Sequence, residues 1–176
     1  MAKGRTKAKF PKAPYFRAPT SWLSIDPASG RKPSYAVRWR RDRPLSFVAI
    51  EHRSMDNISR VLRGNDLVVV EGGGFVGANA ATALSLERVR ERFACIAWQK
   101  KISTLEVSPD HWRSVLQLAA RPRSQAVAAQ RSLCKLLAGK TVPTLRLADK
   151  ATNDDKRAAL LIGWACCKAW NWNRGV

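Results

Sequence analysis

The sequence predicts an α/β domain with a mixed sheet, an antiparallel meander followed by parallel strands, and helices on both faces. Three observations lead to this prediction. The 176 residues are enough for one domain, and the 45% hydrophobic fraction is enough to fill its core. Three short strand-like segments come first and lie close together in the sequence. After them, strand-like and helix-like segments alternate, which is typical of helices that cover a sheet.

The first three strands are expected at 22–25, 34–39 and 45–50. Segment 22–25 is short and apolar, and the residues from Asp26 to Gly30, which include Pro27, read as a turn. The other two segments alternate between apolar and polar residues. Strands so close in sequence favour an antiparallel meander.

A short helix is expected at 56–62, followed by a buried central strand at 67–70, where the residues are continuously apolar and mostly β-branched. After a cluster of glycines comes a helix whose apolar residues step by four, three, four and three. These residues are Thr82, Leu86, Val89, Phe93 and Ile96. The sequence leaves open whether this stripe faces the sheet or a partner subunit.

The remaining elements are one strand and three helices. The strand is expected at 102–107, and Ser108 with Pro109 opens a helix that runs through Leu118. Ala126, Ala129, Leu133 and Leu137 mark the next helix. The last helix is expected from about Asp154 to Cys167, capped by Thr152 or Asn153. We therefore predict a single domain at 21–176, behind a basic flexible tail at 1–20.

The charge indicates a polyanionic partner. Thirty-two Lys and Arg against thirteen Asp and Glu give a net charge of 32 − 13 = +19. Charges of one sign repel each other in the folded chain, and binding to nucleic acid would relieve that repulsion. Six of these cations lie in the tail, which either binds phosphates or is simply solvated. No segment approaches the roughly 20 apolar residues of a membrane span. The spacing of the four cysteines matches no metal-binding motif. We expect them to be free thiols in a reducing compartment. We expect a cytoplasmic protein, with an organelle matrix as the alternative, and no membrane partner.

The few acids are placed informatively. Asp26 ends the first strand, Glu71 ends the buried strand just before three glycines, and Asp154 and Asp155 open the last helix. Carboxylates at the ends of neighbouring strands lie where α/β sheets gather ligands. Because like charges repel, such a cluster needs a cation, and hard oxygen ligands favour Mg²⁺, with Mn²⁺ as a substitute. Each acid also has a simpler interpretation as a turn residue, an exposed strand end or a helix cap.

Three segments, "LSIDPASGRKPSYAV", "VVVEGGGFVGANAATALSLERVRERF" and "NDDKRAALLIGWA", resemble RuvC-type Holliday-junction resolvases in order and spacing. The segment "VSPDHWRSVLQL" resembles the phage and organellar branches of that family. The resemblance covers about residues 22–168. It implies an RNase H-like fold and a dimeric Mg²⁺-dependent endonuclease with two ions in each site. Such an enzyme nicks a four-way DNA junction symmetrically and acts in DNA recombination and repair, without a small-molecule cofactor.

The resemblance makes Asp26, Glu71 and Asp154 or Asp155 the catalytic metal ligands. Members of the family usually carry two acids three or four residues apart on the last helix, but here position 158 is Ala. Adjacent aspartates point about 100° apart on a helix, so both face one site only if the helix begins there.

The resemblance also suggests residues that contact DNA. An aromatic residue usually follows the glutamate by three positions, whereas Phe75 follows Glu71 by four. Phe75 is either a wedge that stacks on bases or a core residue. Arg121, Arg123 and Arg131 lie near positions where the family carries lysines. Other arginines are expected to bind phosphates without reading sequence, namely Arg38, Arg40, Arg41 and Arg43.

We therefore expect a structure-selective DNA endonuclease that resolves four-way junctions. One alternative is a nucleic-acid-binding protein that keeps the fold without catalysis, which Ala158 and the large charge favour. The other is a nuclease of the same fold for forks, flaps or RNA–DNA hybrids. A basic ribosome- or membrane-associated module would leave the placement of Asp26 and Glu71 unexplained.

Overall fold

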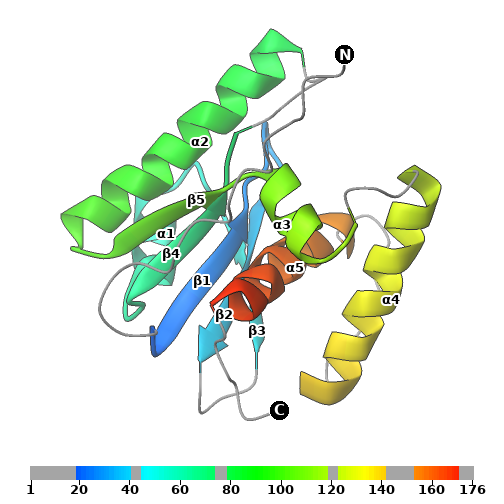
Figure 1. The fold of residues 1–176 in the computed structure, drawn as a ribbon. Coiled ribbons are helices and arrows are strands. Elements are labelled where there is room, and N and C mark those ends of the chain that lie inside the picture. Colours follow the sequence, from blue (N-terminus) through cyan, green and yellow to red (C-terminus); the bar gives the residue numbers. More distant parts are fainter. Residues whose placement is uncertain (1–18, 41–44, 74–78, 119–122, 142–152, 171–176) are drawn as a thin grey trace, which may run out of the picture.

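A computed structural model describes residues 19–40, 45–73, 79–118, 123–141 and 153–170 (Figure 1). Its five-stranded sheet has the order β3-β2-β1-β4-β5. The strands are β1 (Ser21–Asp26), β2 (Ser34–Arg40), β3 (Ser46–Ile50), β4 (Leu67–Glu71) and β5 (Ser103–Val107). The helices are α1 (Met55–Leu62), α2 (Ala80–Gln99), α3 (Pro109–Val115), α4 (Arg123–Thr141) and α5 (Asn153–Ala169).

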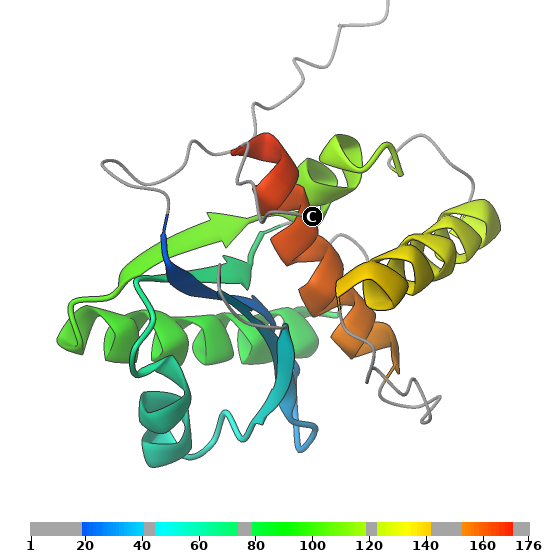
Figure 2. The same cartoon turned by 90° about the horizontal axis from the view of Figure 1, so that it is seen from below.

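The sheet is mixed, as the sequence predicts. β1, β2 and β3 pair antiparallel, whereas β4 pairs parallel with β1, and β5 pairs parallel with β4. Helices α1 and α2 cover one face, and α3, α4 and α5 lie on the other (Figure 2). β4 is buried as expected, but the middle strand is β1, because β2 and β3 fold back on one side of β1 while the parallel crossover adds β4 on the other.

Side-chain alternation divides the core into two layers. Leu23, Ile25 and Val68 point towards α1 and α2, where Val89 and Phe93 of α2 are also buried. The apolar stripe of α2 therefore packs on the sheet, because its buried residues cover that face. The other layer contains Trp22, Trp39, Leu67, Val69 and much of α5.

Several ends follow the expected local chemistry. Ser54, Asn79 and Ser108 each accept a backbone N–H bond and so cap α1, α2 and α3. α3 ends at Val115 and not at Leu118, because Gln117 has a φ of 58°, which the helix cannot continue through. α5 begins at Asn153, and Thr152, the other cap candidate, lies outside the described residues.

No helix among the described residues is long and apolar enough to cross a membrane. The four cysteines are free, and burial raises the pKa of Cys134 to about 12.

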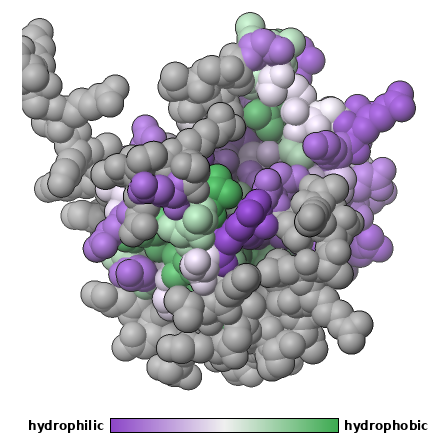
Figure 3. Space-filling model, turned by 90° about the vertical axis from the view of Figure 1, so that its right-hand side faces the viewer, coloured by the Kyte–Doolittle hydropathy of each residue, from purple (hydrophilic) through white to green (hydrophobic). Residues whose placement is uncertain are grey.

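On the face shown in Figure 3, hydrophilic side chains border a small apolar area. Among the coloured residues of this face, the surface is thus mostly polar.

Candidate active site

The parallel pairing of β1 and β4 brings Asp26 and Glu71 to the same level. Ile25 lies level with Val70, and the two acids are the next residue along each strand. Asp26 alternates in phase with Trp22, and Glu71 with Val69, so both point to the face that α5 covers. The two carboxylates, 45 residues apart in the sequence, therefore share one end and one face of the sheet.

α5 adds the third acid to this end of the sheet. The buried Ser24 hydroxyl donates to the carbonyl of Ala159 at 2.6 Å. Trp39 donates to the same hydroxyl at 2.8 Å, and its ring lies against Gly163, where a Cβ would clash with it. These contacts fix α5 across β1 and β2. Asp155 is one turn before Ala159, near the end of β1 that Asp26 occupies.

The three acids interact. The pKa of Asp26 is raised well above its usual value, first by burial and then by the charges of Glu71 and Asp155. A hydrogen bond with the Glu71 side chain raises it further. Asp26 is thus a carboxyl group that is costly to ionise unless a cation joins it.

The structure separates the two aspartates of α5. The Asp154 carboxylate is 75% exposed and pairs with Arg157 three residues later. Asp155 is the one whose charge acts on Asp26. Ala158 lies one turn after Asp154 and three residues after Asp155, where the family pattern has its second acid. The cluster therefore consists of Asp26, Glu71 and Asp155.

Glu71 has a further partner that the sequence analysis did not assign. The indole Nε1–H of Trp112 in α3 donates to Glu71 Oε1 at 2.7 Å. Trp112 is only 2% exposed, so the donor side of this hydrogen bond is buried, while Glu71 is partly exposed. The motif "VSPDHWRSVLQL" includes this Trp, but nothing in its spacing indicates that the indole reaches the end of β4.

The donor set fits a hard divalent cation. Three carboxylates from three elements meet at one end of the sheet, and oxygen ligands are those that Mg²⁺ prefers. Within the described ranges, no three His, Cys, Asp or Glu side chains are already arranged as a metal-holding group. An ion at this site would therefore require the side chains of Asp26, Glu71 and Asp155 to reorient.

A lysine also borders the cluster. Lys156, next to Asp155, places its Nζ 5.2 Å from the centre of the Tyr35 ring. Tyr35 pairs with Asp26 across β1 and β2. Neither residue was singled out from the sequence, because a cation beside an acid on a helix is an ordinary surface pattern.

The arginines expected to contact DNA fall into two groups. Arg38 donates to the carbonyl of Val61 at 2.9 Å, and Arg40 to Ser21 Oγ at 3.4 Å, so both have partners within the fold. Burial, followed by the charge of Arg40, lowers the pKa of Arg38. Arg131 is exposed on α4, and its charge acts on Arg157 of α5, so these two cations lie close together on the α5 side of the sheet.

Four of the expected DNA contacts lie outside the described residues: Arg41, Arg43, Phe75 and Arg121. Arg123 begins α4, and its side chain is likewise not described. The choice between wedge and core for Phe75 therefore stays open.

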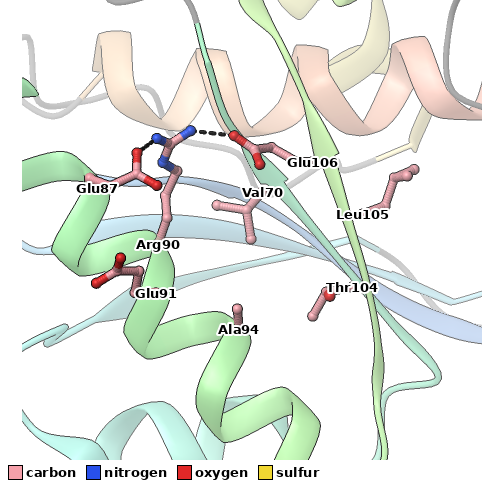
Figure 4. Close-up of a pocket in the computed structure, with 8 residues that line it drawn as sticks. All are labelled: Val70, Glu87, Arg90, Glu91, Ala94, Thr104, Leu105 and Glu106. Carbon is pink, nitrogen blue, oxygen red and sulfur yellow. Dashed lines mark hydrogen bonds and ion pairs between the residues drawn. The ribbon is translucent and has the colours of Figure 1, made fainter.

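A separate pocket lies between α2 and β5 (Figure 4). Arg90 pairs there with Glu87 of its own helix and Glu106 of β5, over an apolar floor that includes Val70. Glu106 also packs against Gly72, where a Cβ would overlap it. Val70 and Glu106 point to the face opposite Glu71, so this pocket is not part of the acid cluster.

No family model matches the sequence, and no curated protein is similar to it. Solved structures are similar in fold. Thermus thermophilus RuvC in complex with a Holliday junction substrate has a TM-score of 0.54 and 12% identity, covering 85% of this chain and 95% of that one. A second T. thermophilus RuvC structure has a TM-score of 0.53 and 11% identity, with 84% and 95% coverage.

The yeast mitochondrial Holliday junction resolvase Ydc2 is also similar, with a TM-score of 0.50, 14% identity, and coverage of 89% of this chain and 83% of that chain. The chain therefore has the fold of the RuvC-type resolvases. The predicted RNase H-like mixed sheet with helices on both faces is confirmed.

Proposed function

We propose that the chain is a magnesium-dependent endodeoxyribonuclease that resolves four-way DNA junctions by paired, symmetric hydrolysis. The observation that carries the proposal is the meeting of Asp26, Glu71 and Asp155 at one end of a sheet with the RuvC-type fold. Burial and the charges of Glu71 and Asp155 disfavour the ionised form of Asp26, which is therefore costly to keep without a ligand. A metal ion bound at this position of the fold would offset that cost.

In this proposal, Asp26, Glu71 and Asp155 hold Mg²⁺, which Mn²⁺ can replace. A bound ion of this kind activates water and stabilises negative charge on the scissile phosphate. The water oxygen forms the new bond to phosphorus and the bond to the 3′ oxygen breaks, leaving a 5′-phosphate and a 3′-hydroxyl. The two-ion site that the resemblance implies needs further oxygen ligands, which the DNA phosphate can supply because Ala158 offers none.

The cations around the cluster support DNA as the substrate. Lys156 and Arg131 lie on the α5 side of the sheet, and the whole chain carries a charge of +19. Such groups bind the phosphate backbone and release its counterions, so affinity for DNA falls steeply with salt. Selection of the junction would then depend on the shape of the DNA and not on base reading.

A homodimer would match the two-fold symmetry of a four-way junction. The outer stripe of α2 supports this, because Leu84 is 54% exposed and Trp98 80% exposed. The stripe has alternating spacings of three and four and comprises Ala81, Leu84, Arg88, Glu91, Cys95 and Trp98, all exposed. Two antiparallel copies would place Arg88 against Glu91 of the partner subunit, so the stripe is self-complementary.

A second candidate is a junction-binding protein without catalysis. Ala158 favours it, as does the absence of a ready-made metal group among the described residues. It would keep the basic surface and lose the ion.

Cleavage of labelled four-way junctions, linear duplex and flap DNA separates these candidates. We expect paired symmetric nicks in the junction alone with Mg²⁺, and none with a chelator or in Asp26→Asn. Tight junction binding without cutting in Mg²⁺ or Mn²⁺ would establish the non-catalytic binder. Stronger cutting of the flap would assign the same fold to another branched substrate.

A further inference from the structure

We propose that Trp112 is a positioning residue, which holds the Glu71 carboxylate by its indole N–H and so presents that carboxylate to Asp26 and the ion. This inference rests on the proposed function. Its basis is the hydrogen bond of 2.7 Å from Trp112 Nε1 to Glu71 Oε1. Glu71 is also hydrogen-bonded to Asp26, so its carboxylate lies between the indole and the cluster.

The chain fixes Trp112 relative to Glu71 through β5. Glu71 pairs in register with Val107, and the amide of Gly72 donates to the carbonyl of Val107 at 3.0 Å. Ser108 follows at once and caps α3, and the amide of Trp112 donates to the carbonyl of Ser108 at 3.3 Å. The position of the indole relative to the carboxylate is therefore determined by a short, hydrogen-bonded segment that leads from Glu71 through Val107 and Ser108 to Trp112.

The chemistry of an indole suits this task. Its N–H is a donor only and carries no charge at any ordinary pH. A lysine in the same place would neutralise Glu71 and compete with a metal ion. The Trp112 indole instead restrains one oxygen and leaves the negative charge of Glu71 for the cation. Second-layer hydrogen bonds of this kind orient metal ligands, and their loss typically lowers affinity about 10- to 100-fold.

Trp112→Phe tests the proposal, since it keeps an aromatic ring and removes the N–H. We expect Mn²⁺ affinity of the DNA-free protein, measured by calorimetry, to fall about 10-fold or more. The turnover rate on junction DNA should fall with the junction dissociation constant unchanged. Trp98→Phe is the control, because it removes an indole N–H from the exposed side of α2, on the face of the sheet opposite the cluster. It should leave Mn²⁺ affinity unchanged.

A spectroscopic readout tests the contact itself. The ¹⁵N–¹H indole resonance of Trp112, assigned by its loss in Trp112→Phe, should shift in Glu71→Gln and on addition of Mg²⁺. A resonance that stays fixed in Glu71→Gln, or a Trp112→Phe variant with wild-type Mn²⁺ affinity, would overturn the positioning role. If the wild type itself binds no Mn²⁺ and cuts no DNA, the proposed function fails, and the metal-directed role of Trp112 fails with it. The Glu71→Gln shift alone would then still report the hydrogen bond.

Discussion

Asp26 is the acid of the site whose pKa is raised. Burial is the largest cause of its raised pKa, and the charges of Glu71 and Asp155 add to it. A carboxyl group with a raised pKa in the folded state stabilises the fold fully below its unfolded pKa of about 4. That contribution is lost as pH rises through the folded pKa. Without metal, Asp26 therefore makes the folded state less stable at neutral pH than at low pH.

Asp26→Asn should accordingly melt at a higher temperature than the wild type in chelator at pH 8. For a chain of this length, each kcal/mol recovered raises the melting temperature by about 2–4 °C. The difference should shrink as pH falls towards 5, and Mg²⁺ should stabilise only the wild type. Melting curves at both pH values measure this. Asp154→Asn, which changes an exposed carboxylate, is the control, and equal melting of Asp26→Asn and wild type at pH 8 would contradict the account.

Ala158 is the residue that distinguishes this site from the family pattern. It lies three residues after Asp155, on the neighbouring turn of the same helix side. A carboxylate there would add a fourth oxygen ligand to the cluster. We expect Ala158→Asp to bind Mn²⁺ about tenfold more tightly, or to take up a second ion, because ligand count and charge set the affinity of oxygen sites.

Calorimetric titration of the DNA-free Ala158→Asp protein gives both affinity and stoichiometry. Ala169→Asp, which adds the same single negative charge at the exposed last residue of α5, is the control for a general electrostatic effect. An unchanged isotherm in Ala158→Asp would show that position 158 does not face the ion.

At the scale of elements, α2 presents two different faces. The side of α2 that carries Val89 and Phe93 covers the sheet, while the outer stripe defined above is exposed. If that stripe is the dimer interface, reversing one charge places like charges together across the two-fold axis. Arg88→Glu should weaken dimerisation about three- to tenfold, a free-energy change of about 1 kcal/mol.

Sedimentation analysis of two single variants and their combination tests this interface. Glu91→Arg should weaken the dimer in the same way, and Arg88→Glu with Glu91→Arg should restore it. Arg63→Glu reverses an exposed charge near α1 and should have no effect. Wild-type behaviour of both single variants would place the interface elsewhere.

The elements themselves follow from local patterns, whereas parts of the site do not. The antiparallel meander and the buried strand ending at Glu71 are predictable, because alternation and apolar runs report burial directly. Once β1 and β4 pair, the meeting of Asp26 and Glu71 follows. The preference for Asp155 over Asp154 depends on the rotation of α5, which Gly163 and Trp39 set by packing. The contact from Trp112 depends on how α3 turns back over β4, and no local pattern encodes that.

In the whole molecule, the acid cluster and the exposed stripe of α2 lie on opposite faces of one sheet. The acid cluster, Trp112 and the bordering cations lie on the side of α3, α4 and α5, and the exposed stripe of α2 lies on the other. In Figures 1 and 2 the two helical layers are on opposite sides of the sheet. A dimer through α2 would therefore leave both acid clusters uncovered.

We propose that Asp26, Glu71 and Asp155, but not Asp154, form the centre that cuts a four-way junction. The most direct measurement compares nick positions and rates on one labelled junction for Asp155→Asn and Asp154→Asn in Mg²⁺. We expect Asp154→Asn to keep paired symmetric nicks near the wild-type rate. Asp155→Asn should bind the junction but cut it on the order of a hundredfold more slowly. Cutting by Asp155→Asn at the wild-type rate, or equal loss in both variants, would contradict the account.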